Sequence, residues 1–183
     1  GGMVAFRRDV YQAVGGYREE LFMHVEEADL AIRLLAAGYV VRLGDAPPID
    51  HTKSVGISSP LVQYLGPRNQ VWYVWHNVPM PRMPVHLLGM MGKGLWHATR
   101  RGHVCRAAWG YMVGVAGIVS RWRQRKPVAS SVFRTIRRLR RDREIKLKAL
   151  AETLPCNKST KKVLVVIEGQ PNAARDLVGS TQG

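Results

Sequence analysis

The chain has 183 residues, of which 46% are hydrophobic and 22% charged, a composition typical of a folded globular protein and not of a disordered one. Its formal net charge of +15 is unevenly distributed. Residues 1–50 hold eight acidic and five basic side chains, whereas residues 51–150 hold two acidic and nineteen basic ones. An acidic segment followed by a basic one suggests that the chain combines a chemical site with a surface for anionic partners.

Cysteine content and hydropathy exclude two further classes of protein. The two cysteines, Cys105 and Cys156, make no disulfide framework and no zinc-site spacing, so we expect a reducing compartment. The longest apolar stretch, residues 107–119, has about 13 residues, fewer than the roughly 20 that cross a bilayer. We therefore expect no membrane-spanning helix, although a helix lying in the membrane interface fits the pattern.

The first 50 residues show the pattern strand, helix, helix, strand. Residues 3–6 are typical of a short buried strand, and residues 9–14 of a helix that stops at the glycines 15 and 16. A second helix is expected from Glu26 to Gly38, followed by a strand over residues 39–43, which are rich in aromatic and β-branched side chains. This order predicts part of an α/β sheet, although too few strands for a complete one.

The rest of the chain is predicted to be helical and basic up to about residue 150. Helices are expected over residues 61–77, 86–102 and 104–125, and from Ser131 onward. The segment Arg121–Lys148 carries twelve basic and two acidic side chains. Residues 151–183 form a tail of unknown role, in which residues 162–169 have the pattern of a strand without an obvious partner.

Three carboxylates lie within four positions at the start of the second predicted helix, namely Glu26, Glu27 and Asp29. The helix dipole and the free N–H groups of the first turn stabilise their ionised form. A carboxylate kept ionised there is able to accept a proton from a bound hydroxyl group. Acids also favour the first turn of any helix, so the cluster taken alone is more simply explained by ordinary helix-start chemistry.

The motifs around these acids favour a catalytic role for the cluster over ordinary helix-start chemistry. In chain order they are Val14-Gly15-Gly16-Tyr17, Glu26-Glu27 with Asp29-Leu30, Ala37-Gly38-Tyr39, His51 and Arg68-Asn69. Their order and spacing over about residues 1–77 resemble the C-terminal half of family 2 glycosyltransferases with a GT-A fold, especially the bacterial rhamnosyltransferase-like members. The resemblance implies an α/β fold class, with the C-terminal, acceptor-side part of a GT-A nucleotide-diphospho-sugar transferase domain over residues 1–60. The helical pattern and basic charge of residues 61–150 predict a membrane-associating extension after it.

The resemblance also implies a catalytic base. The family's Glu-Asp pair corresponds to Glu26-Glu27, and its following aspartate corresponds to Asp29. The usual base of inverting members therefore falls on Glu27, which would take the acceptor hydroxyl proton during a single displacement at the anomeric carbon. A glutamate in place of the usual aspartate is one methylene longer, so Glu26 is a second candidate for this role.

Donor and metal contacts are implied at other positions. Gly2, Arg7, Arg8 and Arg68 are candidate substrate-binding residues, the arginines through phosphate, although exposed arginines are also often only solvated. His51 corresponds to a histidine that faces the metal or the diphosphate in some members, or else it is an ordinary loop histidine. The expected cofactor is Mg²⁺ or Mn²⁺, whose principal ligands, the family's Asp-x-Asp, do not occur in these 183 residues and are expected in an N-terminal half.

The function implied is that of a fragment of an inverting hexosyl- or rhamnosyl-type transferase, inactive by itself. It would act with a nucleotide-sugar donor and a glycan or lipid-linked acceptor, in the cytoplasm, peripherally at the inner face of the cell membrane. The alternative is a non-catalytic nucleic-acid-binding module, since phosphates of either lipid or nucleic acid would attract the basic segment. The apolar helix over residues 104–125 favours lipid, because nucleic-acid binding gives no reason for it.

A series of aromatic residues accompanies the basic segment and fits three interpretations. Ordinary core packing, a belt at the level of lipid headgroups, and a surface that stacks on nucleic-acid bases all use such side chains. The series comprises Tyr64, Trp72, Tyr73, Trp75, Trp96 and Trp109.

Overall fold

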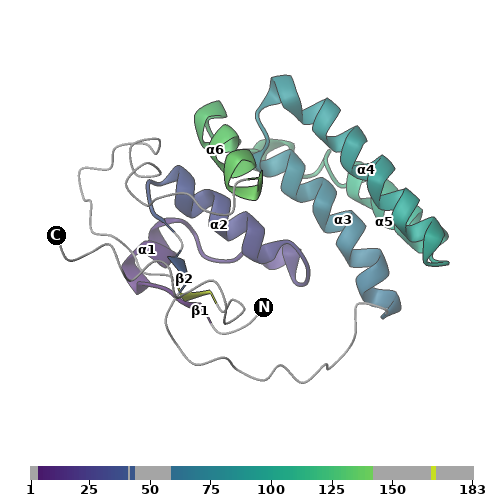
Figure 1. The fold of residues 1–183 in the computed structure, drawn as a ribbon, viewed down its shortest axis with the longest axis horizontal. Helices are drawn as coiled ribbons and strands as arrows, with labels where there is room; N and C mark the ends of the chain where they lie inside the picture. The colour runs from purple at the N-terminus through teal and green to yellow at the C-terminus, as the bar shows by residue number, and fades with distance from the viewer. Residues whose placement is uncertain (1–3, 41, 44–58, 142–165, 168–183) are drawn as a thin grey trace.

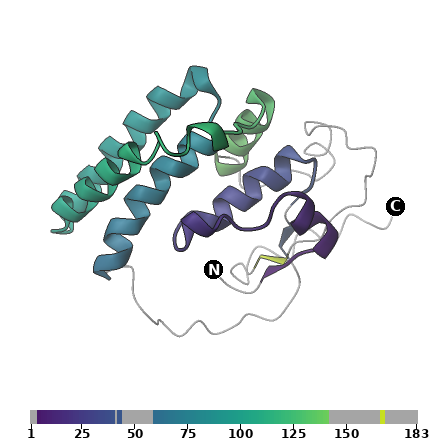
Figure 2. The ribbon, with the colours of Figure 1, turned by 180° about the vertical axis from the view of Figure 1, so that it is seen from behind.

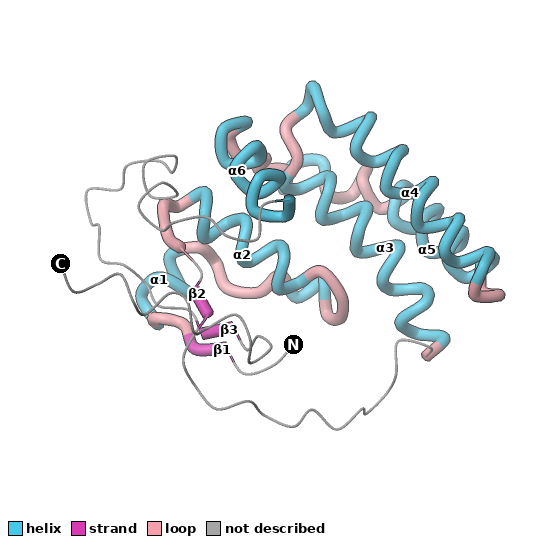
Figure 3. Tube along the Cα trace, viewed as in Figure 1, coloured by secondary structure: helices cyan, strands magenta, loops and turns pink. Residues whose placement is uncertain are grey.

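A computed structural model describes residues 4–40, 42–43, 59–141 and 166–167, and these residues are mainly helical (Figures 1 and 3). The helices are α1 (Arg8–Ala13), α2 (Glu26–Ala36), α3 (Pro60–Asn77), α4 (Met83–Arg100), α5 (Val104–Ala116) and α6 (Ser130–Arg141). Short 3₁₀ helices lie at η1 (Glu19–Leu21), η2 (Met80–Arg82) and η3 (Trp122–Gln124). The strands are β1 (Val4–Ala5), β2 (Arg42–Leu43) and β3 (Val166–Ile167).

The predicted α/β GT-A domain over residues 1–60 is wrong for the part of the chain that the structure describes. The three strands there have two residues each and form one small sheet in the order β1-β3-β2. β3 pairs antiparallel with β1 and parallel with β2, so the strand pattern near residue 166 does find partners. Ladders this short cannot form the wide sheet of an α/β domain, whose strands usually have about five or six residues.

Helix α2 is covered by other helices where an α/β fold would place a sheet. Its start and its stop before Gly38, a residue with a positive φ of 84°, agree with the sequence pattern. On one side Ile32 and Leu35 pack into a core with α3 and α6, and on the other side Leu30 and Leu34 pack against α1. Figures 1 and 2 show α2 between α1 and the remaining helices. Helix α2 is thus packed on two sides.

Helices α3, α4 and α5 pack side by side, and glycines bring α5 close to α3 (Figures 1 and 2). Gly110 and Gly114 of α5 and Gly117, the residue that caps its C-terminal end, are spaced by four and three residues, which places them along one side of the helix. A Cβ on Gly110 would lie 2.4 Å from the carbonyl oxygen of Tyr64, and one on Gly114 would lie 2.9 Å from the Val71 side chain. These glycines permit a backbone approach that no larger residue allows.

Replacing Gly110 with valine is therefore expected to lower the free energy of unfolding by about 1–3 kcal/mol, the usual cost of overpacking. The matched control is Gly92→Val on α4, where a Cβ would meet no atom within 4 Å. An exposed substitution of that kind is expected to stay within about 0.5 kcal/mol of the parent chain. Urea unfolding followed by circular dichroism measures both, and equal stability of the two variants would contradict the close packing.

The aromatic side chains of the basic helical part, residues 61–150, fall into a buried and an exposed group. Trp72, Tyr73 and Trp75 of α3 are buried, as core packing predicts, whereas Trp96 of α4 and Trp109 of α5 are 61% and 59% exposed. Helix α6 turns Val132 and Phe133 into the core and its arginines outward. Among the described residues, no helix combines the length and the apolar character needed to cross a membrane.

Candidate functional site

The acidic cluster occupies the first turn of α2 and is preceded by an unusual backbone. His24 and Val25 both have positive φ, at 70° and 71°. This left-handed conformation is rare for a β-branched residue such as Val25, and it costs on the order of 1–3 kcal/mol per residue. The surrounding contacts must therefore hold this turn, which sets the direction in which Glu26 and Glu27 leave the helix start.

Two residues of α3 hold that turn. The side-chain amide of Asn69 donates to the backbone carbonyls of Met23 and His24. Arg68 donates to the Asn69 side-chain oxygen at 2.9 Å and to the Glu20 carbonyl at 3.1 Å, and its guanidinium lies 4.3 Å from the Trp72 ring centre. Arg68, a predicted substrate-binding residue, thus makes contacts within the chain, and the Arg68-Asn69 pair braces the loop before the acids.

Asp29 is fully buried and joins three segments of the molecule. Its carboxylate accepts hydrogen bonds from Arg33 at 2.8 Å, from Arg18 at 3.2 Å and from the Asn77 amide at 2.7 Å. Arg33 also donates to the backbone carbonyls of the Val14–Gly16 corner. With no surface exposed, the Asp29 carboxylate is placed to hold α2 in position and has no access to a substrate.

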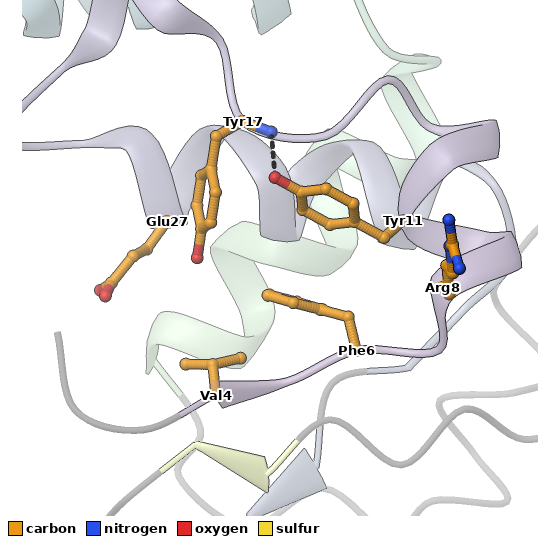
Figure 4. A pocket seen from close by; sticks show the side chains of 6 residues that line it. All are labelled: Val4, Phe6, Arg8, Tyr11, Tyr17 and Glu27. Carbon is orange, nitrogen blue, oxygen red and sulfur yellow. Dashed lines mark hydrogen bonds between the residues drawn. The ribbon is translucent and has the colours of Figure 1, made fainter.

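Glu26 and Glu27 differ in exposure although they are adjacent. One carboxylate oxygen of Glu26 is buried and has no hydrogen-bond partner among the described residues. Glu27 is exposed and lines a surface pocket (Figure 4). Of the three predicted acids, Glu27 is therefore the one whose carboxylate is accessible to a bound molecule.

The pocket combines three aromatic rings with two charged side chains. It has a volume of about 420 Å³, within the usual range for ligand pockets, and is lined by Val4, Phe6, Arg8, Tyr11, Tyr17 and Glu27. The ring centres of Phe6, Tyr11 and Tyr17 lie 5.4 to 6.1 Å apart, in tilted or edge-on contact. Figure 4 shows Glu27 beside Tyr17, with Phe6 and Val4 below them.

A hydrogen bond joins the two pocket tyrosines, and the surroundings of Tyr17 shift its pKa. The Tyr17 backbone N–H donates to the Tyr11 hydroxyl oxygen at 3.1 Å, which ties the corner after Gly16 to α1. Burial, and secondarily the Glu27 carboxylate, raise the pKa of Tyr17 above its ordinary value. Tyr17 therefore keeps its proton at neutral pH, and its hydroxyl is available as a hydrogen-bond donor.

Of the remaining predicted site residues that the structure describes, Arg8 lines this pocket, whereas Arg7 and Arg68 do not. Arg7 is exposed and pairs with Asp9, whereas its neighbour Arg8 does line the pocket. Gly2 and His51 lie outside the described residues, so their proposed roles stay predictions. Within the described ranges, no three His, Cys, Asp or Glu side chains are grouped to hold a metal ion, and we derive no chemical step from Mg²⁺ or Mn²⁺.

Several residues that build the site were not selected from the sequence. The pocket aromatics come from two short segments around the Gly15-Gly16 corner, and this clustering of three rings within twelve positions was the available signal.

His76 of α3 is buried, with its Nε2 atom 3.7 Å from the Glu20 carboxylate. Burial lowers the pKa of His76, which favours its neutral form.

No protein-family model, no curated protein and no solved structure matches this chain. The resemblance to family 2 glycosyltransferases therefore rests on the motifs alone and stays a prediction.

Proposed function

We propose that this chain forms the acceptor side of an inverting transferase that moves a hexosyl- or rhamnosyl-type sugar from a nucleotide-sugar to a glycan or lipid-linked acceptor. A lipid-linked acceptor would place the reaction at the cytoplasmic face of the cell membrane. The observation that carries the proposal is the exposed Glu27 carboxylate on the rim of a pocket lined by three aromatic rings. The neighbouring acid Asp29, by contrast, is fully buried.

The pocket chemistry suits a sugar hydroxyl. The C–H face of a sugar ring carries a small positive charge and packs favourably against the negative face of an aromatic ring. Phe6, Tyr11 and Tyr17 supply such faces, and Tyr17 also keeps a hydroxyl proton to donate. A ring stacked there would bring one of its hydroxyl groups within reach of Glu27.

The proposed step is a single displacement. The acceptor oxygen forms a bond to the anomeric carbon of the donor while the bond from that carbon to the diphosphate oxygen breaks. The hydroxyl proton passes to a carboxylate oxygen of Glu27, and the bonding electrons leave with the nucleoside diphosphate. Arg8 is the cation among the residues that line the pocket, and we assign it to the phosphate oxygens of the donor.

The neighbouring polar residues hold the start of α2 in position for this step. Asp29, held by Arg18, Arg33 and Asn77, fixes the start of α2. Arg68 and Asn69 fix the turn before it. These residues are positioning residues, which set where the Glu27 carboxylate lies without touching the acceptor themselves.

The experiment that tests the pocket uses the complete enzyme and measures acceptor-dependent release of nucleoside diphosphate from a panel of nucleotide-sugars. Tyr17→Ala removes one stacking face, worth about 0.5–1.5 kcal/mol, so we expect the acceptor KM to rise by about two- to tenfold with a smaller change in kcat. The matched control is Phe22→Ala, which removes an aromatic ring that is 75% exposed and lies outside the pocket. An unchanged acceptor KM in Tyr17→Ala would contradict the assignment of this pocket.

A further inference from the structure

Helices α4 and α5 expose large apolar side chains on their outer surfaces. On α4 these are Val85, Leu88 and Trp96, and on α5 Trp109 and Met112, with Val119 just beyond the helix; each is between 57% and 81% exposed. We call these six residues the α4–α5 face. The members on α4 are spaced by three and eight residues, and those on α5 by three, with Val119 seven residues further on. This spacing places the helical members in one strip per helix. Isolated exposed apolar residues are ordinary, but a set aligned along two neighbouring helices marks a contact surface.

This surface is separate from the core. The opposite side of α5 is buried, with Tyr111 packed into a core cluster and Gly110 and Gly114 against α3. Tyr111 is 2% exposed, whereas Trp109 and Met112 on the same helix are largely exposed. Helices α4 and α5 both pack on α3 and on each other (Figures 1 and 2). The six side chains of the α4–α5 face are not buried by this packing.

The charge around the surface is of one sign. Residues 78–141 contain fourteen lysines and arginines and no aspartate or glutamate. Exposed bases accompany the strips, with Lys93 and Arg100 on α4 and Arg106 on α5. Arg100 also lies 5.7 Å from the ring centre of Trp96, so a cation and an exposed indole share one site.

We propose that the α4–α5 face lies on the surface of an anionic bilayer, with both helices parallel to the membrane and the six apolar side chains among the lipid headgroups and upper acyl chains. Tryptophan favours this depth, and the flanking bases meet lipid phosphates. Nucleic acid would satisfy the bases but leave the apolar strips in water. The inference deepens the membrane location within the proposed function, but it rests on side chains remote from the Glu27 pocket.

Sedimentation of the chain with lipid vesicles tests the proposal. We expect binding to vesicles that contain phosphatidylglycerol and little binding to phosphatidylcholine alone. Added salt should weaken the binding without abolishing it, because salt screens the charges but not the apolar contribution. A matched mobility-shift measurement with duplex DNA should show binding that collapses over the same salt range.

The decisive variant is Trp96→Ser with Trp109→Ser, which keeps the net charge and changes only exposed positions. We expect its affinity for anionic vesicles to fall at least about tenfold, whereas Phe22→Ser, which changes an even more exposed aromatic residue outside the face, should bind like the parent chain. Unchanged vesicle binding by the double variant, or DNA binding that survives high salt without any preference for anionic lipid, would overturn the proposal. So would a stable dimer that the double variant dissociates.

The face and the pocket are tested separately. If the double variant loses vesicle binding but still transfers sugar to a soluble acceptor, the result supports the face independently of the pocket. If pocket variants lose transfer but still bind vesicles, the result concerns the pocket alone.

Discussion

Replacing Asp29 with asparagine is expected to lower the free energy of unfolding by about 3–5 kcal/mol, the usual cost of breaking a buried ion pair from one side. Asparagine keeps the shape of the side chain, but it leaves the guanidinium groups of Arg18 and Arg33, which are 19% and 14% exposed, without their anion. Urea unfolding should show a lower midpoint with an unchanged slope.

Asp9→Asn provides the matched control, because it removes the same charge from an exposed pair with Arg7. Exposed pairs of this kind contribute little, so its midpoint should stay close to that of the parent chain. If Asp29→Asn unfolded at the parent's urea concentration, the buried carboxylate would not be the anchor of α2 that the contacts indicate.

Replacing Glu27 with glutamine is expected to lower kcat of the complete enzyme by about 10²–10⁴-fold, the usual contribution of a general base. The change keeps the size of the side chain and removes its ability to take the acceptor proton. Because Glu27 is exposed, the variant should fold normally and bind the nucleotide-sugar with little change. Quenched-flow measurement of product formation, together with donor binding by calorimetry, separates the two effects.

Glu26→Gln is the natural comparison, since it makes the same chemical change one position earlier on a carboxylate that does not line the pocket. We expect a much smaller loss of kcat from it. A Glu27→Gln enzyme that turned over at the parent rate while Glu26→Gln or Asp29→Asn was inactive would move the base to another position.

The helices were largely predictable from the sequence because their signals are local. The end of α2 before Gly38 follows from a residue that accepts a positive φ, and the start of α3 at Pro60 from a proline that suits a first helical turn. What covers α2 was not predictable, because its partners come from α3 and α6, far along the chain. A strand–helix–helix–strand pattern is compatible with a sheet or with helical layers. In this chain, long-range packing covers α2 with the helices α3 and α6.

The site shows the same division between local and long-range information. The run of acids was visible in the sequence, but the roles of its members were not, because Glu27 and Asp29 differ in what surrounds them. Asp29 is buried by Arg18 and Asn77, which lie 11 and 48 positions away. Arg68 is likewise a candidate phosphate ligand from the sequence, whereas in the fold its guanidinium contacts the Glu20 carbonyl and the Trp72 ring.

The proposed role of Glu27 as the proton acceptor is tested most directly by chemical rescue. In the complete enzyme, Glu27→Ala should lose transfer, and its shortened side chain should leave room on the exposed pocket rim for a small carboxylate. Turnover is therefore measured with increasing formate, at constant ionic strength set with chloride. We predict that formate restores part of the rate in Glu27→Ala and has no effect on the parent enzyme or on Glu26→Ala. A Glu27→Ala enzyme that transfers sugar at the parent rate without formate would contradict the proposed function of this carboxylate.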